Sequence, residues 1–409
     1  MGVTFSKLLA ALKPKRRWFQ FSLRTLLLFV LLASVVFAWL GRHIARARVQ
    51  RPIVARIEAA GGQVYYDYQV EPGHIDPTRS PPGWKLVRTV LGDDIFATVQ
   101  VVGLDDPNTK DADVADLHRL PELLDVGLDG SGVTDACIDD LLKIRRLRSL
   151  GLSDTSISPD GLARLSRCKT LQSLSLYGAF ITDQHLRKLA GFPSLKYLYI
   201  ASASIGNDGI RSLGAMHGLR ELGVFGAPSV SDAGFTSLSS LQNLECLQVS
   251  RTGITDVSLK TIGRMHGLKI LRLGGHPITD AGVQHLKALW MLRYLDLSDT
   301  RIGDDTLQVM AAMPDLRQLL LAGTAITDDG LPHLLRLSRI EYLDIGRTAV
   351  TNAGLQKLRS LSSLRQLEVG IGGSLTLDGV DDLKSHLPDC KVQCWVFKPD
   401  GSGYLEAAK

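Results

Sequence analysis

The chain has 409 residues with 45% hydrophobic content, which allows two or three globular domains or one extended repeat array. Its formal charge of +5 is uneven, because eleven of the 47 cations lie in residues 1–57, where there is no acid, and the remaining 36 face 42 acids. A mildly acidic body argues against a nucleic-acid partner. The cysteines are too few and too scattered for a disulfide framework or a metal site, so we expect packed or free thiols at Cys137, Cys168, Cys246, Cys390 and Cys394.

The N-terminus combines a basic leader, residues 1–24, with an apolar segment, residues 25–41, which carries no charge. This pattern predicts a transmembrane helix near the lower limit of length. A cleaved signal peptide and a helix that is buried or lies on a surface are the alternatives. The basic leader favours an inside N-terminus, so we expect a single-pass membrane protein whose body is extracytoplasmic.

Residues 42–98 connect this segment to the rest of the chain. A helical pattern from Arg46 to Ala60 ends at Gly61-Gly62, and a strand-like stretch at 64–68 precedes a loop rich in proline and glycine. Because the open end of a stacked array must be covered, we interpret residues 42–98 as a juxtamembrane N-terminal cap.

A 24-residue period governs the remainder. The unit L-x-x-L-x-L recurs every 24 residues, with one step of 25, and residue 99 lies in the same phase, so we expect about twelve repeats over residues 99–388. The units open at Leu123, Leu147, Leu171, Leu195, Leu219, Leu244, Leu268, Leu292, Leu316, Ile340 and Leu364.

Each repeat has two halves with different periods. The L-x-L alternation predicts a short strand, and the following apolar residues have helical spacing. We therefore predict an α/β fold, a curved solenoid with a parallel sheet on its concave face and helices on its convex face. Residues 389–409 would form a C-terminal cap strand and tail, with the strand at Lys391–Phe397.

Two polar columns accompany the repeats. A Thr-Asp pair or its equivalent starts most helical halves, as in Thr279-Asp280, and we expect one helix cap per repeat from it rather than a calcium or acid–base site. A second column follows the strands and should satisfy backbone groups at the turn, with Thr155, Thr252, Thr300, Thr324 and Thr348.

These residues resemble the leucine-rich-repeat superfamily, in particular its ribonuclease-inhibitor-like and cysteine-containing branch, whose repeats end in I-T-D-x-G-L. The resemblance covers roughly 290 of the 409 residues. Most repeats lack the cysteine that Cys168 represents, which departs from that branch. A basic leader, one membrane segment and such repeats together are similar to bacterial membrane-anchored leucine-rich-repeat proteins, which implies a binding function.

No catalytic motif accompanies the repeats, so we expect a non-enzymatic scaffold without cofactor or metal that binds a protein or peptide as a monomeric array. The alternative is an intracellular adaptor of the F-box type that recruits targets to a degradation machine. That function requires a helical adaptor module before the repeats, where the membrane segment and the cap lie.

The phase of the repeat also predicts the ligand-binding residues. Side chains that flank the buried leucines point to the concave face. The aromatic residues at these positions either recognise a ligand or serve only as cross-strand packing partners. The candidates are Tyr177, Tyr197, Tyr199, Phe225, Tyr294 and Tyr342.

Overall fold

The computed structural model describes residues 23–71, 74–82, 88–89, 92–371, 375–397 and 404–406. The chain forms two compact units, one of residues 1–56 and 66–99 and one of residues 57–65 and 100–409. Nearly all of the basic leader and most of the C-terminal tail lie outside the described residues.

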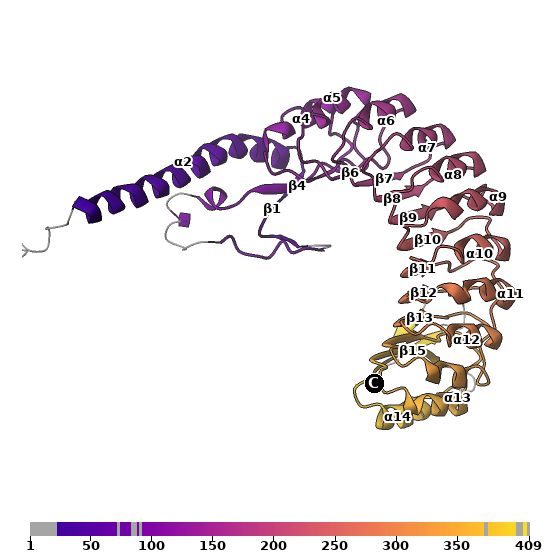
Figure 1. The fold of residues 1–409 in the computed structure, drawn as a ribbon. Helices are drawn as coiled ribbons and strands as arrows, with labels where there is room; N and C mark the ends of the chain where they lie inside the picture. The colour runs from indigo at the N-terminus through magenta and orange to yellow at the C-terminus, as the bar shows by residue number, and fades with distance from the viewer. Residues whose placement is uncertain are drawn as a thin grey trace, which may run out of the picture. The chain divides into compact units, whose positions relative to one another are not determined.

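Helix α2, Leu23–Ala59, is one continuous helix of 37 residues (Figure 1). The sequence instead suggested two elements, residues 25–41 and a helix from Arg46. Nothing between them breaks the helix, because Arg42 and Ala45 are strong helix formers, and Pro52 lies within the helix without ending it. The helix ends as expected at the two glycines, where Gly61 adopts a left-handed φ of 79°.

The two ends of α2 have different surroundings. Twelve large apolar side chains between Leu23 and Trp39 are exposed. The first buried residue is Ala47, and from there one face of the helix packs inward through residues such as Ile53. Within this unit His43 Nδ1 lies 2.9 Å from the carbonyl oxygen of Ile95. The exposed apolar part of α2 therefore gives way to the packed part between Trp39 and Ala47.

The described part of the chain contains one fifteen-stranded sheet, parallel from β4 to β16, in which sequence neighbours pair. A separate two-stranded ribbon, β2 (Val70–Glu71) with β3 (His74–Ile75), belongs to the first unit. The strands of the large sheet are β1 (Gln63–Tyr66), β4 (Val99–Gly103), β5 (Asp125–Gly127), β6 (Ser149–Gly151), β7 (Ser173–Tyr177), β8 (Tyr197–Ala201), β9 (Glu221–Phe225), β10 (Cys246–Ser250), β11 (Ile270–Arg272), β12 (Tyr294–Asp296), β13 (Gln318–Leu320), β14 (Tyr342–Asp344), β15 (Gln366–Ile371), β16 (Lys391–Phe397) and β17 (Tyr404–Glu406).

Helical segments alternate with these strands. Several repeats have a short α-helix followed or replaced by a 3-10 turn, and within the repeat array Figure 1 shows the strands on one side and the helices on the other. The helices are α4 (Asp111–Val114), α5 (Ile138–Leu141), α6 (Pro159–Leu165), α7 (Asp183–Leu189), α8 (Asn207–Leu213), α9 (Asp232–Phe235), α10 (Asp256–Ile262), α11 (Asp280–Val283), α12 (Asp304–Met310), α13 (Asn352–Lys357) and α14 (Leu377–His386). The 3-10 segments are η2 (Asp93–Ile95), η3 (Leu117–Arg119), η4 (Asp135–Cys137), η5 (Thr236–Ser240), η6 (Gln284–Ala288), η7 (Leu331–Arg336) and η8 (Leu358–Ser360).

The leucine columns form the core of the array, as the phase predicted. Strands β4 to β15 open the twelve repeats, and equivalent leucines pair across them, as Leu271 with Leu295 and Leu295 with Leu319. These leucines are completely buried. Neither a strand nor a helix could bury its apolar face alone, so stacking of the repeats creates the core.

Most strands are followed by a tight turn that the sequence did not reveal. In nine repeats an equivalent residue adopts a left-handed φ, at steps of 24 or 25 residues except for the step of 48 from Gly178 to Gly226: Gly130, Asp154, Gly178, Gly226, Arg251, Gly275, Asp299, Gly323 and Arg347. The hydroxyl column that comes next donates to the carbonyl three residues earlier, as predicted; Thr300 reaches Leu297 at 2.6 Å. Thr252 differs, because its hydroxyl lies 2.9 Å from Nε2 of His276.

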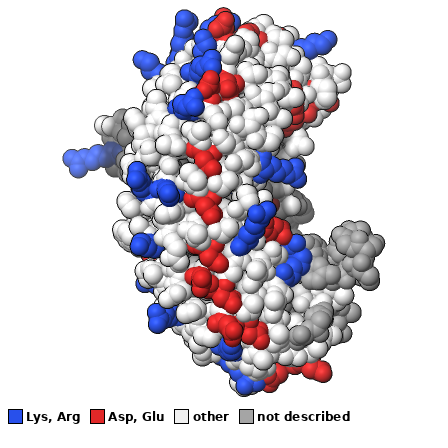
Figure 2. Space-filling model, turned by 90° about the vertical axis from the view of Figure 1, so that its right-hand side faces the viewer, with Lys and Arg blue, Asp and Glu red and all other residues white. Residues whose placement is uncertain are grey.

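The aspartates of the Thr-Asp column link the start of one helix to the start of the next. Oδ1 of Asp256 accepts a hydrogen bond from the backbone N–H of Thr279, one repeat later, at 2.8 Å, and its Oδ2 accepts from the Thr279 hydroxyl at 2.6 Å. Asp304 binds Thr327 and Asp328 binds Thr351 in the same way. We expected a hydroxyl or a carboxylate to cap each helix. The hydroxyls of Thr255 and Thr351 do so, because each accepts a hydrogen bond from the backbone N–H two residues later. The carboxylates connect successive repeats, and Figure 2 shows acidic side chains in a line along the helix-bearing face.

Candidate binding surface

The concave face is defined by side chains at alternate strand positions, which stand in columns across the sheet. The parallel register aligns Tyr199 with Gly223 and then Gln248, and it aligns Tyr177 with Ala201 and then Phe225. All six predicted aromatic residues lie at such positions and are half-buried. Neighbouring side chains therefore cover part of each ring.

Three of the six aromatic residues form one contiguous cluster. The Tyr177 and Phe225 rings meet edge to face, with centroids 6.3 Å apart, across the small side chain of Ala201. A Cβ atom on Gly223 would overlap both Phe225 and Tyr199, so this glycine lets the two rings converge. We call Tyr177, Tyr199 and Phe225 the aromatic cluster. The repeat phase predicts that these three rings share one face of the sheet.

Tyr199 is held by a directed hydrogen bond. Its hydroxyl donates to Oε2 of Glu221, on the next strand, at 2.6 Å. Burial and this bond to a carboxylate raise the pKa of the Tyr199 hydroxyl, so the phenol stays protonated and fixed in orientation. The cluster is therefore pre-organised, with low entropy cost for contact.

The remaining candidates lie elsewhere on the same face. Tyr197 is on β8 with Tyr199 but in another column. Tyr294 is covered by the Arg272 guanidinium, 4.7 Å from the ring centroid. Tyr342 donates its hydroxyl to Glu368, and burial followed by this bond raises its pKa. These contacts agree with the packing alternative for Tyr294 and Tyr342, whose rings already have partners.

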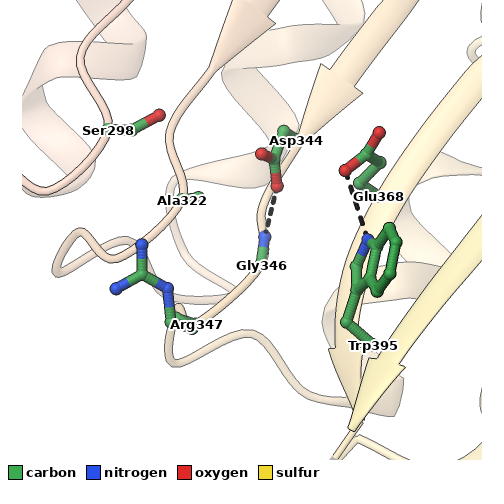
Figure 3. Close-up of a pocket in the computed structure, with 7 residues that line it drawn as sticks. All are labelled: Ser298, Ala322, Asp344, Gly346, Arg347, Glu368 and Trp395. Carbon is green, nitrogen blue, oxygen red and sulfur yellow. Dashed lines mark hydrogen bonds between the residues drawn. The ribbon is translucent and has the colours of Figure 1, made fainter. Parts of the chain in front are cut away.

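A hollow of about 310 Å³ opens near the C-terminal end of the sheet (Figure 3). Its lining includes Asp344, Arg347, Glu368 and Trp395, above the small residues Ser298, Ala322 and Gly346. None of these residues is among the six predicted binding residues, and Trp395 lies outside the repeats from which those six were predicted. That residue follows the last repeat, yet β16 continues the alternation, so extending the phase by one strand would have placed it on this face.

The five cysteine thiols of the chain are free and buried, as expected, and burial raises the pKa of the Cys390 thiol to about 11. Within the described ranges, no three histidine, cysteine, aspartate or glutamate side chains are placed to hold a metal ion.

One family model matches the amino-acid sequence of the chain. The family model described as "Leucine Rich repeat" matches residues 240–263 and 291–311, and each match spans the strand and the helix of one repeat, β10 with α10 and β12 with α12. No curated protein sequence matches the chain significantly.

Solved structures with a similar fold include two internalins from Listeria monocytogenes. An internalin F is 17% identical over 69% of this chain and 92% of its own, with a TM-score of 0.46. An internalin C2 is 18% identical over 63% and 83%, with a TM-score of 0.33. A TLR13–ssRNA13 complex is 16% identical over 74% of this chain and 49% of that chain, with a TM-score of 0.46. Such distant likenesses do not extend to ligands.

The matched segments are ordinary members of a regular series. Residues 291–311 contain β12 and α12, and the same strand-and-helix unit repeats from β4 to β15 with its leucines in register. The sequence match and the repeated geometry together make this chain a leucine-rich-repeat protein.

Proposed function

We propose that the chain is a membrane-anchored recognition scaffold that binds a protein or peptide on its concave face without catalysing a reaction. The aromatic cluster is the observation that carries the proposal. Three rings converge on one rigid sheet, and tyrosine and phenylalanine supply large contact area with little loss of side-chain entropy. A strand-based surface keeps them in place before the ligand arrives.

The membrane part of the proposal rests on α2. The helix is long and apolar enough to cross a bilayer, with a mean hydropathy of 2.3 over its most apolar window and none of that window buried. A signal sequence has the same properties. We infer an anchor because the apolar part continues into a packed helix without interruption, and an N-terminus on the inner side would then place the array outside the cytoplasm.

Site-specific photo-crosslinking tests recognition at the cluster. A photoreactive phenylalanine analogue replaces Gln248, which lies in the Tyr199 column on the nearby strand β10, in the full-length protein expressed in its own membrane. We expect a discrete protein adduct on illumination. The same analogue at Lys260, exposed on helix α10, is the matched control and should give none.

The double substitution Tyr197→Ala with Tyr199→Ala completes this test. It removes the bond to Glu221 and one ring of the cluster, and the adduct at position 248 should be lost while the protein remains folded. An adduct that is unchanged in the folded double variant, or identical adducts from positions 248 and 260, would move the recognition site away from the aromatic cluster.

A further inference from the structure

The hollow at the C-terminal end of the sheet is built by three adjacent strands. Asp344 on β14 pairs in register with Glu368 on β15, and Trp395 on β16 lies next to Gly370 of β15. Small residues also line the hollow, which leaves space between the larger side chains, and the Trp395 indole lies at one end beside Glu368 (Figure 3). Its volume of about 310 Å³ is at the small end for a ligand site and suits one side chain.

The carboxylates of the hollow differ in how they are satisfied. Glu368 accepts hydrogen bonds from the Trp395 indole N–H at 3.2 Å and from Gln366 Nε2 at 3.2 Å, besides the Tyr342 hydroxyl. In the part of the chain that the structure describes, Asp344 accepts a hydrogen bond to its Oδ1 from the backbone N–H of Gly346 at 2.8 Å. Among the described residues no lysine, arginine or histidine forms an ion pair with Asp344.

The arginine at the rim is already engaged. The Arg347 guanidinium lies 2.7 Å from Oδ1 of Asp299, two repeats away along the array. Gly323 lies between them, and a Cβ atom there would overlap the Asp299 carboxylate and crowd the guanidinium. Among the described residues that line the hollow, Arg347 is the one cation, and its ion pair is with Asp299 rather than with Asp344 or Glu368.

We propose that this hollow binds one arginine side chain of the ligand, with its guanidinium against the carboxylates of Asp344 and Glu368 and its flat face against the Trp395 ring. A guanidinium is planar, pairs with carboxylates through several N–H groups and stacks on aromatic faces, which the three side chains here offer together. The assignment rests on the proposed function only in taking the ligand to be a protein or peptide.

The electrostatics of Asp344 support this assignment. Burial raises the pKa of its carboxyl group to about 6, and the charges of Glu368 and Asp296 act in the same direction, while the Gly346 bond and the Arg347 charge oppose them. Burial makes the ionised form of Asp344 unfavourable, so a bound cation would stabilise that form more than it would stabilise an exposed carboxylate.

The test uses the full-length protein in detergent micelles with its five tryptophans replaced by 5-fluorotryptophan. Nα-acetylarginine methylamide is titrated while fluorine NMR is recorded, and the Trp395 signal is assigned with a Trp395→Phe variant. We expect a saturable shift of the Trp395 signal alone. Nα-acetylcitrulline methylamide has nearly the same shape without charge and should leave this signal in place. An equal shift with both compounds, or no shift with arginine, overturns the proposal.

Asp344→Asn should weaken arginine binding at least about tenfold, the effect expected from losing one charged hydrogen-bond partner. Asp305→Asn, at an exposed position of helix α12, is the matched control and should not change it. The remaining tryptophan signals report whether each variant is folded. Unchanged binding by folded Asp344→Asn overturns the assignment, and this small-molecule titration can fail while crosslinking at the aromatic cluster succeeds.

Binding should also depend on pH. Asp344 must be ionised to hold the guanidinium, so affinity is full above its pKa near 6 and falls by about tenfold between pH 7 and pH 5. The groups that face it are Glu368 on β15, Asp296 on β12 and Arg347 after β14. Asp344→Asn should remove most of this dependence. An affinity that stays constant from pH 7 to pH 5 contradicts the proposed role of Asp344.

Discussion

The type of residue at the third position of each helical half depends on the side chain that begins the helix of the preceding repeat. Where an aspartate or asparagine begins the preceding helix, a glycine commonly occupies this position, because the side chain leaves no room for a Cβ atom, as with Asp256 above Gly282. Ser258 and Thr306 replace glycine where their hydroxyls donate to the carboxylate. His185 stands there because Pro159 precedes it, and its Nδ1 accepts the Thr182 backbone N–H in place of a carboxylate.

This dependence predicts a coupling between Asp256 and Gly282. We expect Gly282→Ala to destabilise the array by about 1–3 kcal/mol through overlap with the Asp256 carboxylate, although alanine is the better helix former. Asp256→Ala should cost about 1–2 kcal/mol through its lost hydrogen bonds to Thr279. The double variant should cost at least about 1 kcal/mol less than the sum, because the methyl group then has space. Additive losses in denaturant melts would contradict this packing.

His276 should make stability depend on pH. Its Nδ1 lies 2.8 Å from the Leu273 carbonyl oxygen and its Nε2 lies 2.9 Å from the Thr252 hydroxyl. Burial lowers its pKa, so the folded state holds it neutral. Its contribution is complete above the unfolded pKa of about 6.5 and is lost as pH falls through the lower folded value.

The variant His276→Thr isolates this effect, because threonine fills the same column at Thr300 and Thr324. We expect the variant to lose less stability than the parent protein between pH 7.5 and pH 5 in urea melts. If both proteins lose the same amount, His276 does not titrate in this range.

At the scale of elements, the strands were predictable and the turns were not. Leucine spacing alone fixes which side chains of a strand are buried, because each repeat must present apolar residues to both neighbours. The left-handed turn residue escaped notice because Asp154, Arg251, Asp299 and Arg347 occupy it beside glycines, so composition gives no uniform signal. The helical stretch 278–289 divides into α11 and η6, a distinction that apolar spacing does not carry.

Leu295 offers a test of the strand faces. It is completely buried in the middle of the array, and Leu295→Ala should cost about 2–5 kcal/mol of unfolding free energy. Asp299 follows the same strand at an exposed position, adopts a φ of 55° and pairs with Arg347. Glycine is therefore the proper control, and Asp299→Gly should cost less than about 1 kcal/mol. Equal losses in the two variants would mean that the faces are misassigned.

For the whole molecule, the positions of residues inside the repeats could be predicted from the sequence better than those of residues outside them. Inside the series, the strand face on which Tyr177 or Tyr199 lies follows from the phase, whereas the convergence of the rings depends on contacts such as the one that Gly223 permits. Trp395 and the hollow lie where the series ends, and their grouping depends on β16 joining the sheet beside β15. Outside the series, the helical patterns before and after residue 42 gave no sign that they form one helix, since no residue between them marks a boundary.

The final prediction concerns the apolar part of α2. Leu28 and Leu32 are exposed there, one helical turn apart, and two lysines at these positions should oppose membrane insertion by about 5–7 kcal/mol. Leu28→Lys with Leu32→Lys should therefore move the protein from the carbonate-resistant membrane fraction to the soluble fraction. Ala55→Lys with Ala59→Lys, an equally spaced exposed pair beyond the apolar part of the same helix, should leave it in the membrane. Recovery of the unaltered protein at full mass in the carbonate supernatant would contradict the anchor, and recovery at a mass reduced by the N-terminal segment would identify that segment as a cleaved signal peptide.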